Sequence, residues 1–109
     1  MGWEYTVTLN NNNYEKAIDA LYHAFHVFTN QYTLVRDNTG FTLIKSGDPK
    51  WPAIQISINT ADEKTYGVPC GEKYLYCLFY ISGDKAWEIM ECIKNTLNKL
   101  NYQYAIDDL

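Results

Sequence analysis

The sequence predicts an α+β domain with a mainly antiparallel sheet of about six strands and two amphipathic helices, in the order β-α-β-β-β-β-α-β. Residues 74–81 are all apolar or aromatic, which is typical of a strand in the middle of a sheet. Apolar residues recur every three or four positions over residues 14–28 and 86–100, which is typical of helices with one buried face. The other segments are short, alternate apolar with polar residues and are bounded by turn residues, which favours strands.

The first strand and the first helix are expected on either side of four asparagines. Residues 3–9 alternate, which predicts a half-buried strand. The asparagines at 10–13 end it, and Asn12 with Glu15 three positions later is typical of a capping box at a helix start. The helix then carries one apolar stripe: Tyr14, Ala17, Ile18, Leu21, Phe25 and Phe28.

The middle of the chain predicts a hairpin and one further strand. Residues 32–36 and 41–45 are rich in β-forming residues, and the turn sequence at 37–40 separates them. Residues 46–52 contain two prolines and a glycine, so a loop is expected there. Residues 53–59 alternate with their isoleucines inward, and a long polar connection is expected over 60–71.

The last part predicts the central strand, the second helix and a final strand. Ser82-Gly83-Asp84 follows the apolar run, and Asp84 is the expected helix cap. The helix stripe comprises Ala86, Ile89, Met90, Ile93, Leu97 and Leu100. Asn101 marks its end, and a short strand over 102–106 should precede an acidic tail at 107–109. The pattern does not say which sheet face each helix covers, although threonine-rich outer rows indicate that part of the sheet lies open to solvent or to another molecule.

Size and composition predict a single domain over residues 1–109 in the cytoplasm. The 109 residues are 47% hydrophobic and 20% charged, which suits one core. No apolar run approaches a membrane span and no export signal is recognised, so we expect neither membrane contact nor secretion. The three cysteines are odd in number and form no C-x-x-C pair, which favours free thiols in a reducing compartment.

Charge argues against direct binding of nucleic acid. The net charge is −4, the pI is about 5.0, and lysine and arginine form no cluster. Nucleic-acid binders usually present a basic face to phosphates. An acidic chain instead suits a basic partner.

No set of residues predicts an enzyme, a metal site or a cofactor. His23 and His26 lie three apart on the first helix, but without a second ligand pair they are best explained as surface residues. Cys70 lies in an expected loop with no base identified beside it. We therefore expect no catalytic residues, no metal ligands and no cofactor.

Aromatic residues suggest instead a docking surface for a protein. Ten tyrosines and three tryptophans exceed what one small core easily hides, and tyrosine and tryptophan dominate protein interfaces. Several acidic residues lie in the same long connection as one of these tyrosines. The expected partner-binding residues are Trp51, Asp62, Glu63, Tyr66, Glu72, Asp107 and Asp108.

The chain resembles, in type, the small immunity proteins of contact-dependent growth inhibition and other polymorphic-toxin systems of bacteria. It is a short, acidic α+β chain, rich in Asn, Tyr, Ile and Lys, that ends in a helix and a strand, ECIKNTLNKLNYQYAIDDL. The resemblance implies a non-enzymatic inhibitor that binds and neutralises one cognate toxin domain, often a nuclease. It assigns no functional residues.

Three alternative functions are also compatible with the sequence. A phage- or plasmid-encoded inhibitor of another host protein would have the same sequence character. A small-ligand-binding domain would need a pocket between helices and sheet. An enzyme built on Cys70 and a histidine is the least favoured of the three. A homodimer is also compatible with the sequence.

Overall fold

The computed structural model describes residues 3–45, 47, 51–65 and 67–108, and it confirms the predicted α+β class and element order. The elements are β1 (Trp3–Leu9), α1 (Tyr14–Ala24), a short 3₁₀ helix η1 (Phe25–Phe28), β2 (Tyr32–Arg36), β3 (Gly40–Lys45), β4 (Trp51–Thr60), β5 (Lys73–Phe79), α2 (Gly83–Lys99) and β6 (Tyr104–Asp108). Within the described residues, the six strands form one antiparallel sheet in the order β2-β3-β4-β5-β1-β6. No helix in this part of the chain has both the length and the apolar character needed to cross a bilayer.

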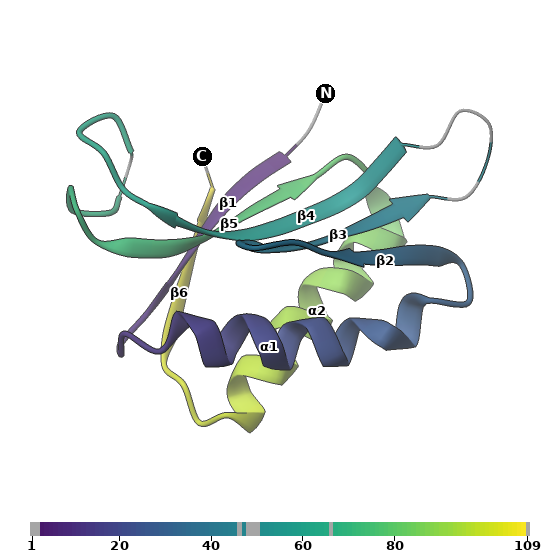
Figure 1. Cartoon of the computed structure of the whole chain (residues 1–109), viewed down its shortest axis with the longest axis horizontal. Helices are drawn as coiled ribbons and strands as arrows, with labels where there is room; N and C mark the ends of the chain where they lie inside the picture. Colours follow the sequence, from purple (N-terminus) through teal and green to yellow (C-terminus); the bar gives the residue numbers. More distant parts are fainter. Residues whose placement is uncertain (1–2, 46, 48–50, 66, 109) are drawn as a thin grey trace.

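Both helices lie on the same face of the sheet, which answers the question that periodicity left open (Figure 1). The opposite face carries no helix. The connection from β4 to β5 bends toward that second face, where Ala61 and Val68 pack on Tyr74 and Tyr76. The sheet is therefore covered on one side by helices and on the other only at one end.

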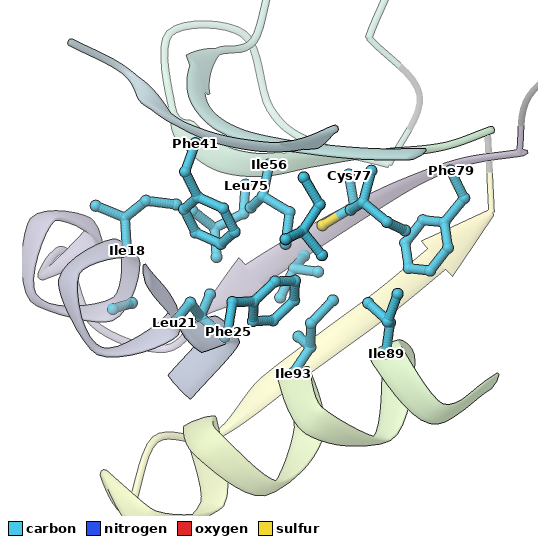
Figure 2. Close-up of a cluster of buried hydrophobic side chains, with 14 of the residues drawn as sticks. Ile18, Leu21, Phe25, Phe41, Ile56, Leu75, Cys77, Phe79, Ile89 and Ile93 are labelled. Atoms are coloured by element: carbon cyan, nitrogen blue, oxygen red, sulfur yellow. The ribbon is translucent and has the colours of Figure 1, made fainter. Parts of the chain in front are cut away.

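The core fills the space between the sheet and the two helices (Figure 2). All six members of the apolar stripe predicted over residues 14–28 are buried, although the expected single helix is divided: four members lie on α1, and Phe25 and Phe28 lie on η1. Phe25 packs edge to face against Phe41 of the sheet. In α2 the stripe is buried at Ile89, Ile93 and Leu97, whereas its other members lie half-buried at the margin. Each large side chain buried in this way contributes roughly 1.5–3 kcal/mol before entropy is subtracted.

Both predicted helix caps are wrong by one or two residues. Asn13, not Asn12, caps α1, and its side chain accepts a hydrogen bond from the Lys16 backbone N–H at 3.4 Å. The predicted capping box, which paired Asn12 with Glu15, therefore starts one residue too early. In α2 the N-cap residue is Ser82, and Asp84 lies in the first turn, where its charge is favourable near the positive helix end.

Three strand boundaries also differ from the sequence prediction. Trp51 and Pro52 begin β4 and do not belong to a loop, because the register shifts between Leu43 and Ile44 and a proline is tolerated at such an irregularity. β5 ends at Phe79, opposite the first described residue of β1. The expected acidic tail is part of β6, where Asp107 and Asp108 pair with β1.

Candidate interaction face

The second face of the sheet presents a continuous row of side chains that alternate away from the core. Because Ile54, Ile56 and Leu75 point to the helices, the residues between them point the other way. We call this surface the helix-free face. It comprises Glu4, Thr6, Thr8, Thr33, Val35, Thr42, Ile44, Gln55, Ser57, Asn59, Tyr74, Tyr76, Leu78, Ala105 and Asp107.

An apolar pocket of about 340 Å³ lies on this face over β2, β3 and β4. It is lined by Val35, Thr42, Ile44, Trp51, Pro52 and Gln55, and we call it the Trp51 pocket. Trp51 is 54% exposed and Val35 is 44% exposed, both high for large apolar side chains. Pro52 joins the wall because the irregular register brings it opposite Ile44. The pocket is thus an apolar recess with two exposed anchors on its rim.

Among the described strand residues of the helix-free face, the charged ones are all acidic. Glu4 and Asp107 lie on it, one strand apart, and we call this pair the acidic edge. Arg36 and Lys73 occupy the alternate positions of their strands, which turn toward the helix side. Lys45 also occupies an alternate position and pairs directly with Trp51, so Trp51 lines the pocket from the end of β4 and does not belong to the outward row of the strand. Among the described strand residues, the helix-free face therefore carries no lysine or arginine.

Arg36 is an example of a cation on the helix side of the sheet. Its guanidinium binds the Asp19 carboxylate of α1, with 2.5 Å between Nη2 and Oδ1. It also lies over the Tyr22 ring, 4.9 Å from the ring centre. The arginine is consequently engaged with α1 and contributes its charge there.

Tyr76 connects the acidic edge to the centre of the face. Its hydroxyl donates a hydrogen bond to Oε1 of Glu4. Burial, followed by that bond to a carboxylate, raises the pKa of Tyr76 above its ordinary value, so the hydroxyl stays a neutral donor. Glu4 is thereby held in one orientation, with its second oxygen available to another donor.

Thr6 lies between these groups, opposite Tyr76 on one side and Asp107 on the other. It is fully buried, and its hydroxyl has no hydrogen-bond partner in the described part of the chain. Leaving a buried hydroxyl unpaired costs about 1–3 kcal/mol. An unpaired polar atom in the middle of the acidic edge is therefore an energetic anomaly of this face.

The structure places the expected partner-binding residues in separate locations. Trp51 lines the pocket and Asp107 belongs to the acidic edge. Asp108 falls on the alternate side of β6, opposite Tyr5. Asp62, Glu63 and Glu72 are exposed in the β4–β5 connection, at the far end of β4 from Trp51, and Tyr66 lies outside the described residues.

Within the connection, Asp62 has a local structural role. Its carboxylate accepts hydrogen bonds from the Lys64 backbone N–H at 2.9 Å and from the Thr65 hydroxyl at 3.0 Å. This arrangement stabilises the turn that carries Ala61 toward Tyr74. Glu63 and Glu72 have their side chains in solvent.

Sequence patterns missed Val35, Ile44 and Glu4 as candidate site residues. Alternation in residues 3–9 does separate Glu4 from the buried row, which was the available signal. It cannot show that Glu4 lies beside Asp107, because that proximity comes from the pairing of β1 with β6.

Two of the other surface depressions are larger than the Trp51 pocket. A polar cleft of about 610 Å³ lies between the β1–α1 turn and the start of β5, lined by Leu9, Asn10, Asn12, Tyr14, Gly71, Glu72 and Lys73. A groove between the helices includes Val27 and Trp87, each 68% exposed. The groove also contains Glu88 and Lys99, so both signs of charge line it.

The groups considered for chemistry are dispersed. Among the described residues, no group of three or more His, Cys, Asp or Glu side chains is placed to hold a metal ion. His26 is exposed, and its Nδ1 lies 3.0 Å from the Tyr22 carbonyl oxygen. Cys70 is exposed, whereas burial raises the pKa of the Cys77 thiol to about 12 and so favours its unreactive form.

Fold and face together define a small α+β domain whose sheet is covered by helices on one side and open on the other. Comparison with known protein families, with curated proteins and with solved structures found no match to this chain. The helix-free face combines an apolar recess over β2–β4 with two carboxylates on β1 and β6, which is chemistry suited to binding.

Proposed function

We propose that this chain is a non-enzymatic binding protein that neutralises a cognate toxin domain, as the small bacterial immunity proteins do. The single observation that supports this most is the helix-free face, whose described strand residues carry only acidic charges and over which the Trp51 pocket opens, lined by the exposed Trp51 and Val35. Large exposed apolar side chains beside a polar margin are typical of protein interfaces. The acidic, short and aromatic-rich character of the whole sequence agrees with the resemblance to immunity proteins.

The two parts of the face have different tasks in this mechanism. The Trp51 pocket would hold an apolar side chain of the toxin, and burial of such an anchor mainly slows dissociation. The acidic edge would attract and orient cationic groups, which mainly speeds encounter and selects the partner. A nuclease fits this description best among toxins, because nucleases carry cations that bind phosphate.

Acting as an inhibitor, the protein would work in the bacterial cytoplasm and would need no cofactor. The three described cysteines are unpaired, which agrees with a reducing compartment. Inhibition would follow from covering the active site of the toxin or the path of its substrate. No bond is made or broken by the chain itself.

The test uses two exposed tryptophans on opposite sides of the molecule. The toxin domain encoded beside this gene would be expressed with the chain, and growth rescue and calorimetric affinity would be measured. Trp51→Ala should weaken binding at least tenfold, or about 1.4 kcal/mol, because Trp51 is the exposed anchor of the pocket.

Trp87→Ala is the matched control, because Trp87 is exposed on α2 in the groove between the helices. It should leave both rescue and affinity unchanged. If the adjacent toxin domain is neither bound nor neutralised, the immunity function is wrong. If Trp87→Ala weakens binding and Trp51→Ala does not, the helix side is the docking surface.

A small-ligand-binding function is the second candidate, supported by the polar cleft beside Tyr14. Asn10, Asn12, Glu72 and Lys73 bring amides and both signs of charge to one cleft of about 610 Å³. A thermal-shift screen against polar metabolites would test it, since a ligand at a hundred times its Kd stabilises by about 2.7 kcal/mol. Any hit should be lost in Lys73→Ala.

A further inference from the structure

Building on the proposed function, on which this inference rests, we infer that the partner of the helix-free face presents an apolar side chain and an arginine about 14 Å apart. The apolar side chain enters the Trp51 pocket and the arginine binds the acidic edge. Register, charge and the anomaly at Thr6 support this specificity independently of one another.

Strand register fixes the spacing between the two contact points. Val35, Thr42, Gln55, Leu78 and Glu4 form one row of directly paired residues across β2, β3, β4, β5 and β1. Thr42, in the pocket wall on β3, is three strands away from Glu4 on β1. Neighbouring strands are about 4.8 Å apart, so the pocket and the acidic edge are separated by about 14 Å. Leu78, half-buried on β5, lies between them and offers no competing charge.

Charge argues against a second copy of this chain as the occupant. The described strand residues of the helix-free face include Glu4 and Asp107 but no lysine or arginine, so a second such face brings no cation to pair with these carboxylates. Like charges brought together in an interface cost several kcal/mol. The occupant is therefore a different protein that brings positive charge.

The acidic edge is built to favour arginine over lysine. Glu4 and Asp107 are diagonal neighbours around Thr6, and diagonal pairs in a sheet are about 7–8 Å apart, within reach of one long planar group. Tyr76 occupies one oxygen of Glu4 and leaves the other free. A guanidinium presents several donors in one plane, so it can contact both carboxylates, whereas an ammonium acts as a point charge.

Thr6 adds an acceptor at the same place. Its hydroxyl is fully buried on the helix-free face, opposite Asp107, and has no partner among the described residues. Because the hydroxyl has no exposed surface, an arginine donor reaches it only if the side chains around the acidic edge move on binding. Binding with such a movement would satisfy a polar atom that the free protein leaves unpaired.

The experiment uses defined peptides, so that it can succeed or fail separately from toxin neutralisation. Acetylated, amidated Leu-Thr-Thr-Thr-Arg spans about 13 Å between its end residues when extended. It would be titrated into ¹⁵N-labelled protein, with Leu-Thr-Thr-Thr-Lys, Leu-Thr-Thr-Thr-Glu and Leu-Thr-Arg as comparisons. We expect amide shifts at Val35, Ile44 and Glu4, and an affinity for the arginine peptide at least fivefold above the other three.

Two adjacent carboxylates on opposite faces of β6 give the matched variants. Asp107→Asn should abolish the preference for arginine over lysine, because only the Glu4 carboxylate remains, whereas Asp108→Asn, opposite Tyr5, should preserve it. Equal affinity for all four peptides, shifts confined to Trp87 and its groove, no shift at millimolar arginine peptide, or a stable dimer through this face in sedimentation would each overturn the inference. Arginine preference without toxin rescue would uphold it and refute the proposed function instead.

Discussion

Thr6 lowers the stability of the free protein, because its side chain buries an unpaired polar atom. Its hydroxyl is buried without a partner in the described chain, in a strand whose neighbours are otherwise well paired. Valine has nearly the same shape and no hydroxyl, so replacing threonine removes the unpaired group without opening a cavity. A site that binds a partner through this hydroxyl would keep the threonine despite its cost.

Thr6→Val should therefore raise the free energy of unfolding by about 1–2 kcal/mol, because the desolvation cost of the hydroxyl disappears. Urea denaturation followed by circular dichroism would measure it. Thr8→Val is the control on the same strand and face; Thr8 is half-buried, so its change should stay within about 0.5 kcal/mol. A destabilised Thr6→Val protein would mean that the hydroxyl has a partner and would contradict the interpretation.

Tyr76 should give a pH signature in the alkaline range. Because burial and the hydrogen bond to Glu4 raise its pKa, the folded state keeps the phenol proton where the unfolded state loses it. The resulting stabilisation is fully present below the ordinary tyrosine pKa of about 10 and is lost as the pH rises above it.

Ultraviolet titration of the folded protein compares the parent with Tyr76→Phe. Just above the ordinary tyrosine pKa of about 10, the two proteins should differ by less than one phenolate, because Tyr76 ionises at higher pH than an ordinary tyrosine. A parent with one additional phenolate at that pH would show that Glu4 does not hold this proton. Stability of Tyr76→Phe should also fall less steeply than that of the parent above pH 10.

Among the elements, the β2–β3 hairpin depends on a glycine for space and not for backbone angle. A Cβ at Gly40 would overlap the backbone carbonyl of Ile56 in β4. Asp37 completes the turn by accepting N–H donors from Thr39 and Gly40, each at 2.8 Å. The Thr39 bond is the main reason that the pKa of Asp37 lies below its ordinary value, so the turn keeps its charged acceptor into mild acid.

Gly40→Ala should cost about 1–3 kcal/mol or more, because the obstacle is backbone that cannot rotate away. The same urea measurement reports it. Asn38→Ala, at an exposed position of the same turn, should change stability by less than about 0.5 kcal/mol. If Gly40→Ala unfolds at the parent midpoint, β3 does not approach β4 as closely as described. Because the hairpin carries Val35 and Ile44, loss of the Trp51 pocket should accompany this change.

Local patterns predicted the elements well wherever one face alone is apolar. The α1 stripe and the alternation of β1 specify their buried faces without help from the rest of the chain. Ends of elements were less predictable, because they depend on neighbours. Trp51 and Pro52 join β4 only because β3 is present to pair with them. Asn13 caps α1, but by residue type the neighbouring asparagines could cap the helix equally well.

At the scale of the whole molecule, the choice of sheet face lay beyond the sequence for a physical reason. β5 is apolar on both sides, with Leu75, Cys77 and Phe79 toward the helices and Tyr74, Tyr76 and Leu78 away from them. Either side could have received a helix. Long-range pairing decides, and the same pairing brings Glu4 and Asp107 together from the two ends of the described chain.

The pairing of β1 also determines when the sheet can close during synthesis. Of the six strands β1 is made first, yet within the described residues it pairs only with β5 and β6, which come from residues 73–79 and 104–108. Contacts so distant in sequence make folding slow, since a large loop must close before they form. The nascent N-terminal half therefore exposes Val7 and the inner row of β1 until the last strands leave the ribosome. A cell that makes this protein would depend on rapid completion of the chain, or on chaperones, to keep that row from aggregating.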